Sequence, residues 1–240
     1  MFGSTDRGLV RSDNQDSYEV GILSDGLCYA VLCDGMGGEN GGSIASRLAV
    51  DFAKQALERD LAPDMGEMQV RSVFASAIAG ANALIFDKAQ EDEELRRMGT
   101  TMILAAILGD TLYVSSVGDS RVYLTGPGDE EQQLTKDHTV VQMMVDNGEI
   151  TKEDAAIHPK RHYITRVVGV SPDAEPDFSV VELVPGQIVL LCSDGLYNYL
   201  QPGQLPWLLR SCLELDSAQP LIDLALDCGG EDNVTAVILS

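Results

Sequence analysis

The sequence is short of basic residues. Its 240 residues include 16 lysines and arginines against 38 aspartates and glutamates, which gives a formal net charge of −22. Nucleic acids and anionic membranes are bound by basic patches, so this balance argues against both as partners. It is compatible with binding of metal cations or of basic segments of another protein, although an acidic surface that keeps the protein soluble accounts for most of the charge.

Histidine and paired cysteine are also scarce. Three histidines are too few for a histidine-rich zinc site. The five cysteines form no Cys-x-x-Cys pair, and Cys28, Cys33 and Cys192 lie in apolar runs that are typical of buried thiols in a reducing compartment. No apolar stretch approaches the roughly 18 residues of a membrane span, and the N-terminus lacks the apolar core of a signal peptide. We therefore expect a cytoplasmic protein.

Aspartate beside glycine, in contrast, recurs along the chain. The apolar run 27–33 predicts a buried strand, and it ends in Asp34 within a turn that contains Gly35, Gly37 and Gly38. Glycine lets the backbone approach a ligand closely, and a carboxylate beside bare carbonyl groups suits a hard cation. The alternative at this point is a tight turn in which Asp34 caps a helix that begins after Gly42.

Three further aspartates have a similar setting. Asp119 and Asp194 each follow an apolar run, and Asp232 lies in an acidic glycine loop. Converging carboxylates repel one another by about 4 kcal/mol at ~4 Å and an effective dielectric near ~20, unless cations neutralise them. Oxygen ligands indicate magnesium or manganese, and two such ions suit phosphoryl hydrolysis. For Asp119 the alternatives are a hydrogen-bonded turn and a salt bridge to Arg121.

The remaining pattern predicts alternating strands and helices. Strands are expected at residues 18–23, 27–33, 102–108, 112–117, 122–124, 178–184, 187–192 and 234–239, and helices at 43–60, 67–90, 140–146, 152–157, 204–213 and 218–226. A turn at 24–26 joins the first two strands, and Pro185 and Gly186 are expected to join a strand pair. Residues 1–17 and 125–133 are expected to be polar and irregular. The basic cluster 158–162 is either a surface loop or a segment that steers a negatively charged substrate.

Seven short segments stand out in order along the whole chain. They are Arg11-Ser12-Asp13-Asn14-Gln15-Asp16, Asp34-Gly35-Met36-Gly37-Gly38, Met98-Gly99-Thr100-Thr101, Val117-Gly118-Asp119-Ser120-Arg121, Thr135-Lys136-Asp137-His138, Ser193-Asp194-Gly195 and Gly230-Glu231-Asp232-Asn233. One such motif is a weak signal, but the ordered set is specific. With these segments the chain resembles the metal-dependent type 2C Ser/Thr protein phosphatases (the PPM family), in their compact bacterial form.

The resemblance implies an α+β fold, in which two central antiparallel sheets are flanked by helix pairs in a layered α-β-β-α sandwich. It also implies one catalytic domain over residues 1–240, with a variable flap at about 140–170. The alternation of strands and helices agrees with such layers.

The resemblance also implies metal ligands. Asp34 would bridge two central Mn²⁺ or Mg²⁺ ions, with the Gly35 carbonyl on one of them, and Asp194 and Asp232 would complete the other site. Asp119 matches the residue that bacterial members use, with Asp194, for a third ion. Asp34, Asp194 and Asp232 are therefore the expected catalytic residues.

Other roles follow from the same resemblance. Arg11 would bind the substrate phosphate, Asp16 would act through metal-bound water, and Asn233 would support the ligands. The general acid stays unassigned, because Met36 and Glu39 stand where many members carry histidine. A metal-bound water could supply that proton.

The implied activity is hydrolysis of phosphoserine and phosphothreonine in proteins by direct attack of a metal-bridging water. The expected partners are phosphoprotein substrates and a Ser/Thr kinase with its targets, and the expected state is a monomer. The alternative is a non-catalytic regulatory module that binds metal or phosphoprotein on the same fold. The complete set of aspartates and the presence of Arg11 argue against that alternative.

Overall fold

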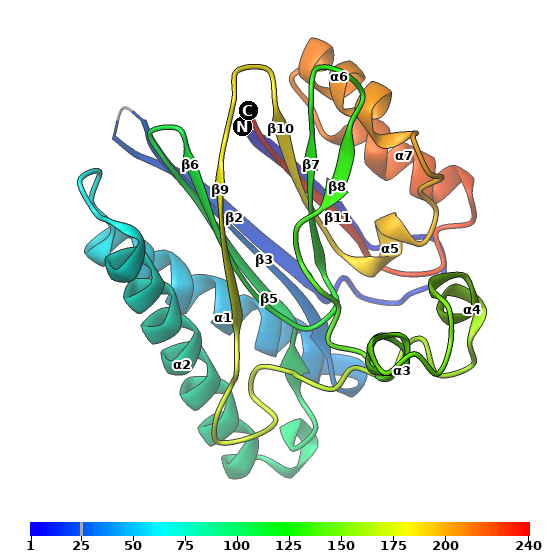
Figure 1. The fold of residues 1–240 in the computed structure, drawn as a ribbon. Helices are drawn as coiled ribbons and strands as arrows, with labels where there is room; N and C mark the ends of the chain where they lie inside the picture. The colour runs from blue at the N-terminus through cyan, green and yellow to red at the C-terminus, as the bar shows by residue number, and fades with distance from the viewer. Residues whose placement is uncertain (25) are drawn as a thin grey trace.

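Two antiparallel sheets form the centre of the computed structural model, which describes residues 1–24 and 26–240 (Figure 1). The strands are β1 (Phe2–Asp6), β2 (Asp16–Ser24), β3 (Leu27–Met36), β4 (Gly99–Thr100), β5 (Met102–Leu108), β6 (Thr111–Val117), β7 (Arg121–Thr125), β8 (Glu131–Gln133), β9 (Asp177–Glu182), β10 (Ile188–Cys192) and β11 (Val234–Leu239). One antiparallel sheet has the order β1-β11-β10-β7-β8. The other has the order β2-β3-β5-β6-β9, with β4 paired to β3.

Helices lie on the outer face of each sheet and at one end of the sandwich. They are α1 (Gly38–Asp60), α2 (Glu67–Glu91), the 3₁₀ helix η1 (Glu93–Leu95), α3 (Val140–Asp146), α4 (Lys152–Ile157), α5 (Asp194–Tyr197), α6 (Leu205–Leu215) and α7 (Gln219–Asp227). The long pair α1 and α2 packs on the six-stranded sheet, and α6 and α7 pack on the other (Figure 1). The expected α-β-β-α sandwich is confirmed.

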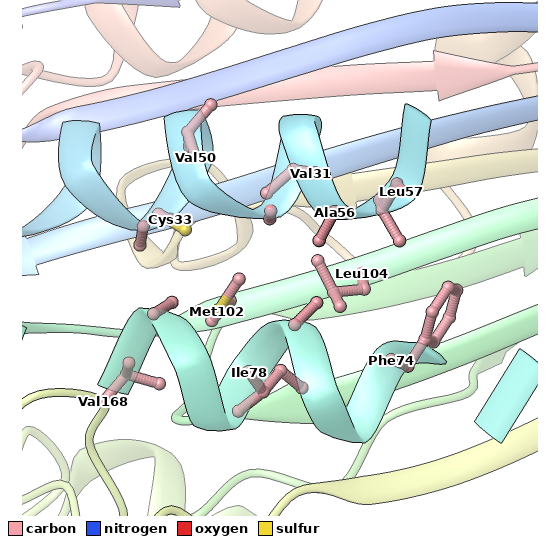
Figure 2. Packing of buried hydrophobic residues seen from close by; sticks show 14 of the residues in the cluster. Val31, Cys33, Val50, Ala56, Leu57, Phe74, Ile78, Met102, Leu104 and Val168 are labelled. Carbon is pink, nitrogen blue, oxygen red and sulfur yellow. The ribbon is translucent and has the colours of Figure 1, made fainter. Parts of the chain in front are cut away.

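The sequence of β5 shows why the layers stack in this way. Leu104 packs towards α1 and α2, beside Phe74 and Ile78 (Figure 2), whereas Ile103 and Ala105 face the second sheet. Successive side chains of a strand point to opposite faces, so a strand that is buried on both faces is apolar throughout. Each fully buried side chain of this size contributes roughly 1.5–3 kcal/mol to stability.

Helix α2 corrects the expectation that no apolar stretch of the chain approaches the length of a membrane span. By length and composition alone it is apolar enough to cross a membrane. In the structure Phe74, Ile78 and Ile85 on this helix are fully buried in the core. The hydrophobic face therefore has a partner within the fold, as expected for a core helix of a layered domain.

Several local predictions were wrong. Residues 178–184 and 187–192 do not form a hairpin, because β9 pairs with β6 while β10 pairs with β7 and β11 in the other sheet. Strands β1 and β8 lie in segments that were expected to be irregular, and both are edge strands with few large apolar side chains. Helix α1 begins at Gly38, before Gly42. In the expected turn at 24–26, Asp25 lies outside the described residues.

The chain changes sheets between β6 and β7. Gly118, Asp119 and Ser120 make this crossing, since β6 belongs to the six-stranded sheet and β7 to the other. Gly118 has a φ of 107°, and a β-carbon there would lie 2.6 Å from Cγ2 of Thr101. Only glycine fits this backbone without strain. The crossing places Asp119 between the two sheets, where the functional site is formed.

Candidate metal centre

Four aspartates meet where strands of both sheets end. Asp34 is near the end of β3, Asp119 lies in the sheet crossing, Asp194 is the first residue of α5, and Asp232 precedes β11. All four line a cavity of about 420 Å³ together with Arg11. Sequence reasoning grouped these residues through their glycine-rich settings, and the structure brings them together.

Electrostatics show how tightly the carboxylates are grouped. The pKa of Asp34 is raised well above its usual value, first by burial and then by the carboxylates of Asp16, Asp194, Asp119 and Asp232. Burial raises the pKa of Asp194 to about 8, with Asp119 and Asp232 as the next causes. Burial likewise raises the pKa of Asp119 to about 6. Such a group favours a bound cation, because a cation removes the mutual repulsion.

Asp16 supplies a further sign that the site of the aspartates can hold a water or an ion. It lies opposite Asp34 in the β2–β3 pair. Its Oδ2 accepts hydrogen bonds from Ser193 Oγ at 2.7 Å and Thr235 Oγ1 at 2.6 Å. Its Oδ1 is buried and has no hydrogen-bond partner in the described protein. A buried polar atom without a partner is costly, so a water or ion at this oxygen would stabilise the site.

The oxygen donors fit a hard cation such as magnesium or manganese. Among residues 1–24 and 26–240, no three histidine, cysteine, aspartate or glutamate side chains are spaced as a ready-made metal cage. The fit therefore rests on the donor chemistry and on the unpartnered Oδ1 of Asp16.

Backbone contacts fix Asp34 and Gly35. The N–H of Asp34 donates to Thr101 Oγ1 at 2.9 Å, and the N–H of Thr101 donates to the Asp34 carbonyl at 2.8 Å. The N–H of Gly35 donates to the Gln15 carbonyl at 3.0 Å. A β-carbon at Gly35 would collide with the carbonyl oxygen of Gly42. This close approach is why glycine follows the aspartate.

Arg11 lies beside the carboxylates and is paired with one of them. Its Nη2 donates to Asp232 Oδ2 at 2.7 Å, and this hydrogen bond is the main cause of its raised pKa. The pair is partly exposed, with 55% of the Arg11 side chain and 34% of the Asp232 side chain accessible. An accessible guanidinium at the rim of the cavity can also bind a phosphate oxygen.

Asn233 joins the loop that carries Arg11 to the loop that carries Asp232. Its side-chain nitrogen donates to the carbonyls of Arg7 and Asp13 at 2.8 Å each, and its oxygen accepts from the Gln15 N–H at 2.8 Å. These three bonds place two segments from opposite ends of the chain side by side.

The structure adds residues that sequence reasoning left without a role. Ser193 and Thr235 hold Asp16. Asp137 pairs with Arg121 at 2.7 Å, so the alternative of a salt bridge between Asp119 and Arg121 is wrong. The sequence could have pointed to Asp137, because it lies in one of the seven segments, Thr135-Lys136-Asp137-His138. No sequence pattern singled out Thr235, which lies inside a buried strand.

The basic cluster 158–162 lies within residues 140–170, the segment expected to be a flap, and it reaches the site. Figure 1 shows α3 and α4 near α5, and residues of all three helices line one cavity with Asp119 and Asp194. His162 lines the cavity with Arg11, and Arg161 lines adjoining cavities with Asp194. This location favours the substrate-steering interpretation over a plain surface loop. Met36 lines the same cavity as His162, as expected from its motif.

Comparisons with known proteins agree with the site. The model of the protein phosphatase 2C family matches residues 10–226. The chain is 35% identical to the serine/threonine phosphatase stp of Listeria innocua, over 98% of this chain and 93% of that one. It is also 35% identical to the Mycobacterium tuberculosis serine/threonine phosphatase PstP/Ppp, whose crystal structure matches with a TM-score of 0.88 over 99% of this chain and 96% of that one.

A second solved structure bears on the metal. The catalytic domain of serine threonine protein phosphatase PstP in complex with two manganese ions matches with a TM-score of 0.84 and 35% identity, over 99% of this chain and 95% of that one. The resemblance inferred from the seven segments is confirmed. The chain belongs to the protein phosphatase 2C family and is a phosphoprotein phosphatase.

Proposed function

We propose that this protein removes phosphate from phosphoserine and phosphothreonine in protein substrates and that it requires a divalent cation. The observation that carries the proposal is the cavity in which Asp34, Asp119, Asp194 and Asp232 lie beside Arg11. This arrangement combines an oxygen-rich cation site with a cation that can bind phosphate. Relatives of this chain carry the name serine/threonine phosphatase, and one of them binds two manganese ions.

Two central Mn²⁺ or Mg²⁺ ions would be held by Asp34, the Gly35 carbonyl, Asp194 and Asp232. Asp119 and Asp194 would hold a third, weaker ion. When bound, such ions lower the pKa of water and neutralise phosphate oxygens. The raised pKa values of Asp34 and Asp194 support the assignment, because these carboxylates gain most from a neutralising cation.

The side chains around the cation site bind and orient the substrate. The guanidinium of Arg11 holds phosphate oxygens through its paired N–H groups, for which it exchanges its contact with Asp232. The unpartnered Oδ1 of Asp16 would orient a water beside Asp34. Met36 has no proton to donate, so the general acid stays unassigned among the side chains, and a water could supply the proton to the leaving serine or threonine oxygen.

The flap, residues 140–170, supplies the basic wall of the site within a single catalytic domain. Arg161 and His162 face the cavities around Asp194, where they attract the dianionic phosphate group of a substrate. The substrates are phosphoproteins, and their source is a Ser/Thr kinase that acts on the same targets. We further propose a cytoplasmic monomer, and the net charge of −22 supports a protein that stays monomeric and does not bind nucleic acid.

Matched phosphopeptides test this function. Peptides that differ only in carrying phosphoserine, phosphothreonine or phosphotyrosine are incubated with the protein in manganese, magnesium or excess chelator. We expect phosphate release from the phosphoserine and phosphothreonine peptides in manganese or magnesium, and no release in excess chelator. Metal-dependent binding of phosphopeptide without any release of phosphate would instead indicate a regulatory module.

A further inference from the structure

Asp137 and His138 have no role in the proposed function, although they lie in one of the seven segments. They follow β8 and precede α3. Their side chains are only 11% and 6% accessible. Buried charged and polar side chains need partners, and those partners turn out to be the two segments that carry Asp119 and Asp194.

His138 holds the segment of Asp119. The N–H of Gly118 donates to His138 Nδ1 at 3.1 Å, and the N–H of His138 donates to the Gly118 carbonyl at 2.9 Å. Because Nδ1 accepts a hydrogen bond, the ring proton lies on Nε2, which faces Asp177 Oδ2 at 3.3 Å. Two hydrogen bonds therefore fix the residue immediately before Asp119.

Asp137 holds the segment of Asp194 through two intermediates. Its carboxylate accepts from Arg121 Nε at 3.0 Å and from Nη2 at 2.7 Å. The guanidinium carbon of Arg121 lies 3.7 Å from the ring centroid of Tyr197. Tyr197 is the last residue of the short helix α5, and Asp194 is its first. A bidentate, partly buried ion pair and a cation–π contact together hold this helix.

The flap is anchored at His138. The N–H of Thr165 donates to the His138 carbonyl at 2.7 Å. Nη1 of Arg166 donates to Asp177 Oδ1 at 2.9 Å, and the other oxygen of the same carboxylate faces His138 Nε2. The neighbouring Ile164 lines the cavity of the aspartates. A shift of His138 would therefore move Asp119 and the flap together.

We propose that Asp137 and His138 are positioning residues, which hold Asp119 and Asp194 at the spacing needed for the weaker third cation and fix the flap beside them. The inference rests on the proposed role of Asp119 and Asp194. The competing view is that the two residues only fill the interior. The two views predict different cation binding. Residues that only fill the interior have no reason to affect the weaker binding step more than the tight one.

Manganese titration calorimetry on chelator-treated protein tests the proposal. Asp137→Asn and His138→Leu remove the ion pair and the hydrogen-bond acceptor. We expect His138→Leu to keep the tight binding step while the affinity of the weaker step falls at least about tenfold, with a lower kcat. Asp137→Asn acts through Asp194, which both proposed sites share, so it should weaken the weaker step by a similar factor and the tight step by less. His138→Asn should restore most of the weaker step, since its amide oxygen can accept the Gly118 N–H.

Asp60→Asn is the matched control. Asp60 forms a similar two-bond pair with Arg59 at 2.8 and 2.6 Å, at the exposed end of α1. This variant should titrate like the wild type. If His138→Leu does not fold, Asp137→Asn, which keeps the size of the side chain, decides the question.

Asp119→Ala distinguishes a failure of the positioning role from a failure of the proposed third cation site. If Asp119→Ala loses the weaker step while folded Asp137→Asn and His138→Leu keep it, the positioning role is wrong and the third site stands. If Asp119→Ala itself leaves titration and turnover unchanged, the proposed third site fails, and the positioning role fails with it.

Discussion

Arg11 and Asp232 form an ion pair with 2.7 Å between Nη2 and Oδ2. The pair joins the proposed phosphate-binding cation to a proposed metal ligand. A metal at Asp232 and a phosphate at Arg11 would each replace one half of this pair. Binding of the two ligands is therefore expected to be cooperative, because the first ligand frees the group that the second one needs.

Substitution of Arg11 tests this coupling. Arg11→Ala should raise KM for a small phosphate ester, because the phosphate loses its guanidinium. It should also increase, and not decrease, the affinity for manganese, since Asp232 loses a competing cation. The pair is partly exposed, so its removal should change the affinity by no more than about fivefold, the equivalent of about 1 kcal/mol. Calorimetry and steady-state kinetics measure the two effects, and weaker metal binding would contradict the coupling.

Asn233 provides a prediction about stability. Asn233→Ala removes three hydrogen bonds between the loops of Arg11 and Asp232. At about 0.5–1.5 kcal/mol each, the free energy of unfolding should fall by about 2–4 kcal/mol. Urea denaturation measures this change. Asn147→Ala, at an exposed helix end, should change it by less than about 0.5 kcal/mol.

The buried carboxylates predict the pH dependence of the metal-free protein. The pKa values of Asp16 and Asp119 are raised to about 6 and that of Asp194 to about 8, against about 3.9 in an unfolded chain. Between these values the folded state binds more protons than the unfolded state, so stability falls as pH rises. In chelator, Tm should be higher near pH 6 than near pH 8.

Metal should reverse this dependence, because the cation competes with protons for the same oxygens. Thermal melts with and without manganese at the two pH values measure the effect. Asp16→Asn should reduce the pH dependence in chelator. A metal-free Tm that increases from pH 6 to pH 8 would show that burial and mutual repulsion do not raise the pKa values of these carboxylates.

The flap predicts an effect on substrate binding. Arg161 lies at the exposed rim of the cavities around Asp194. Arg161→Ala should raise KM for a phosphopeptide roughly two- to fivefold, as expected for loss of an exposed charge contact. The effect should shrink at high salt because of screening. Arg210→Ala, on α6, is the control, and equal KM values for the two variants would remove Arg161 from substrate binding.

Much of the local structure could be predicted from the sequence, because it depends on local patterns. Residues 102–108, 140–146, 152–157 and 234–239 form the expected elements with the expected limits. Asp34, Asp119, Asp194 and Asp232 could be grouped because glycine-rich turns at strand ends leave a recognisable signal.

The pairing of distant segments could not be predicted in this way. The pattern of residues 178–192 is that of two strands, but only tertiary packing shows that β9 and β10 belong to different sheets. The contact of Arg121 with Asp137 across 16 residues likewise depends on how the chain returns after β8. The ion pair of Arg11 and Asp232 joins segments 221 residues apart.

Phosphate release from a phosphothreonine peptide, measured beside equilibrium dialysis with manganese for the wild type and Asp34→Asn, tests the central claim most directly. The wild type should bind at least two ions and release phosphate only when metal is present. Asp34→Asn should bind fewer ions and release phosphate at the background rate, because the shared carboxylate is lost. Wild-type turnover in excess chelator, or by Asp34→Asn, would contradict the claim that the clustered aspartates form a catalytic metal centre.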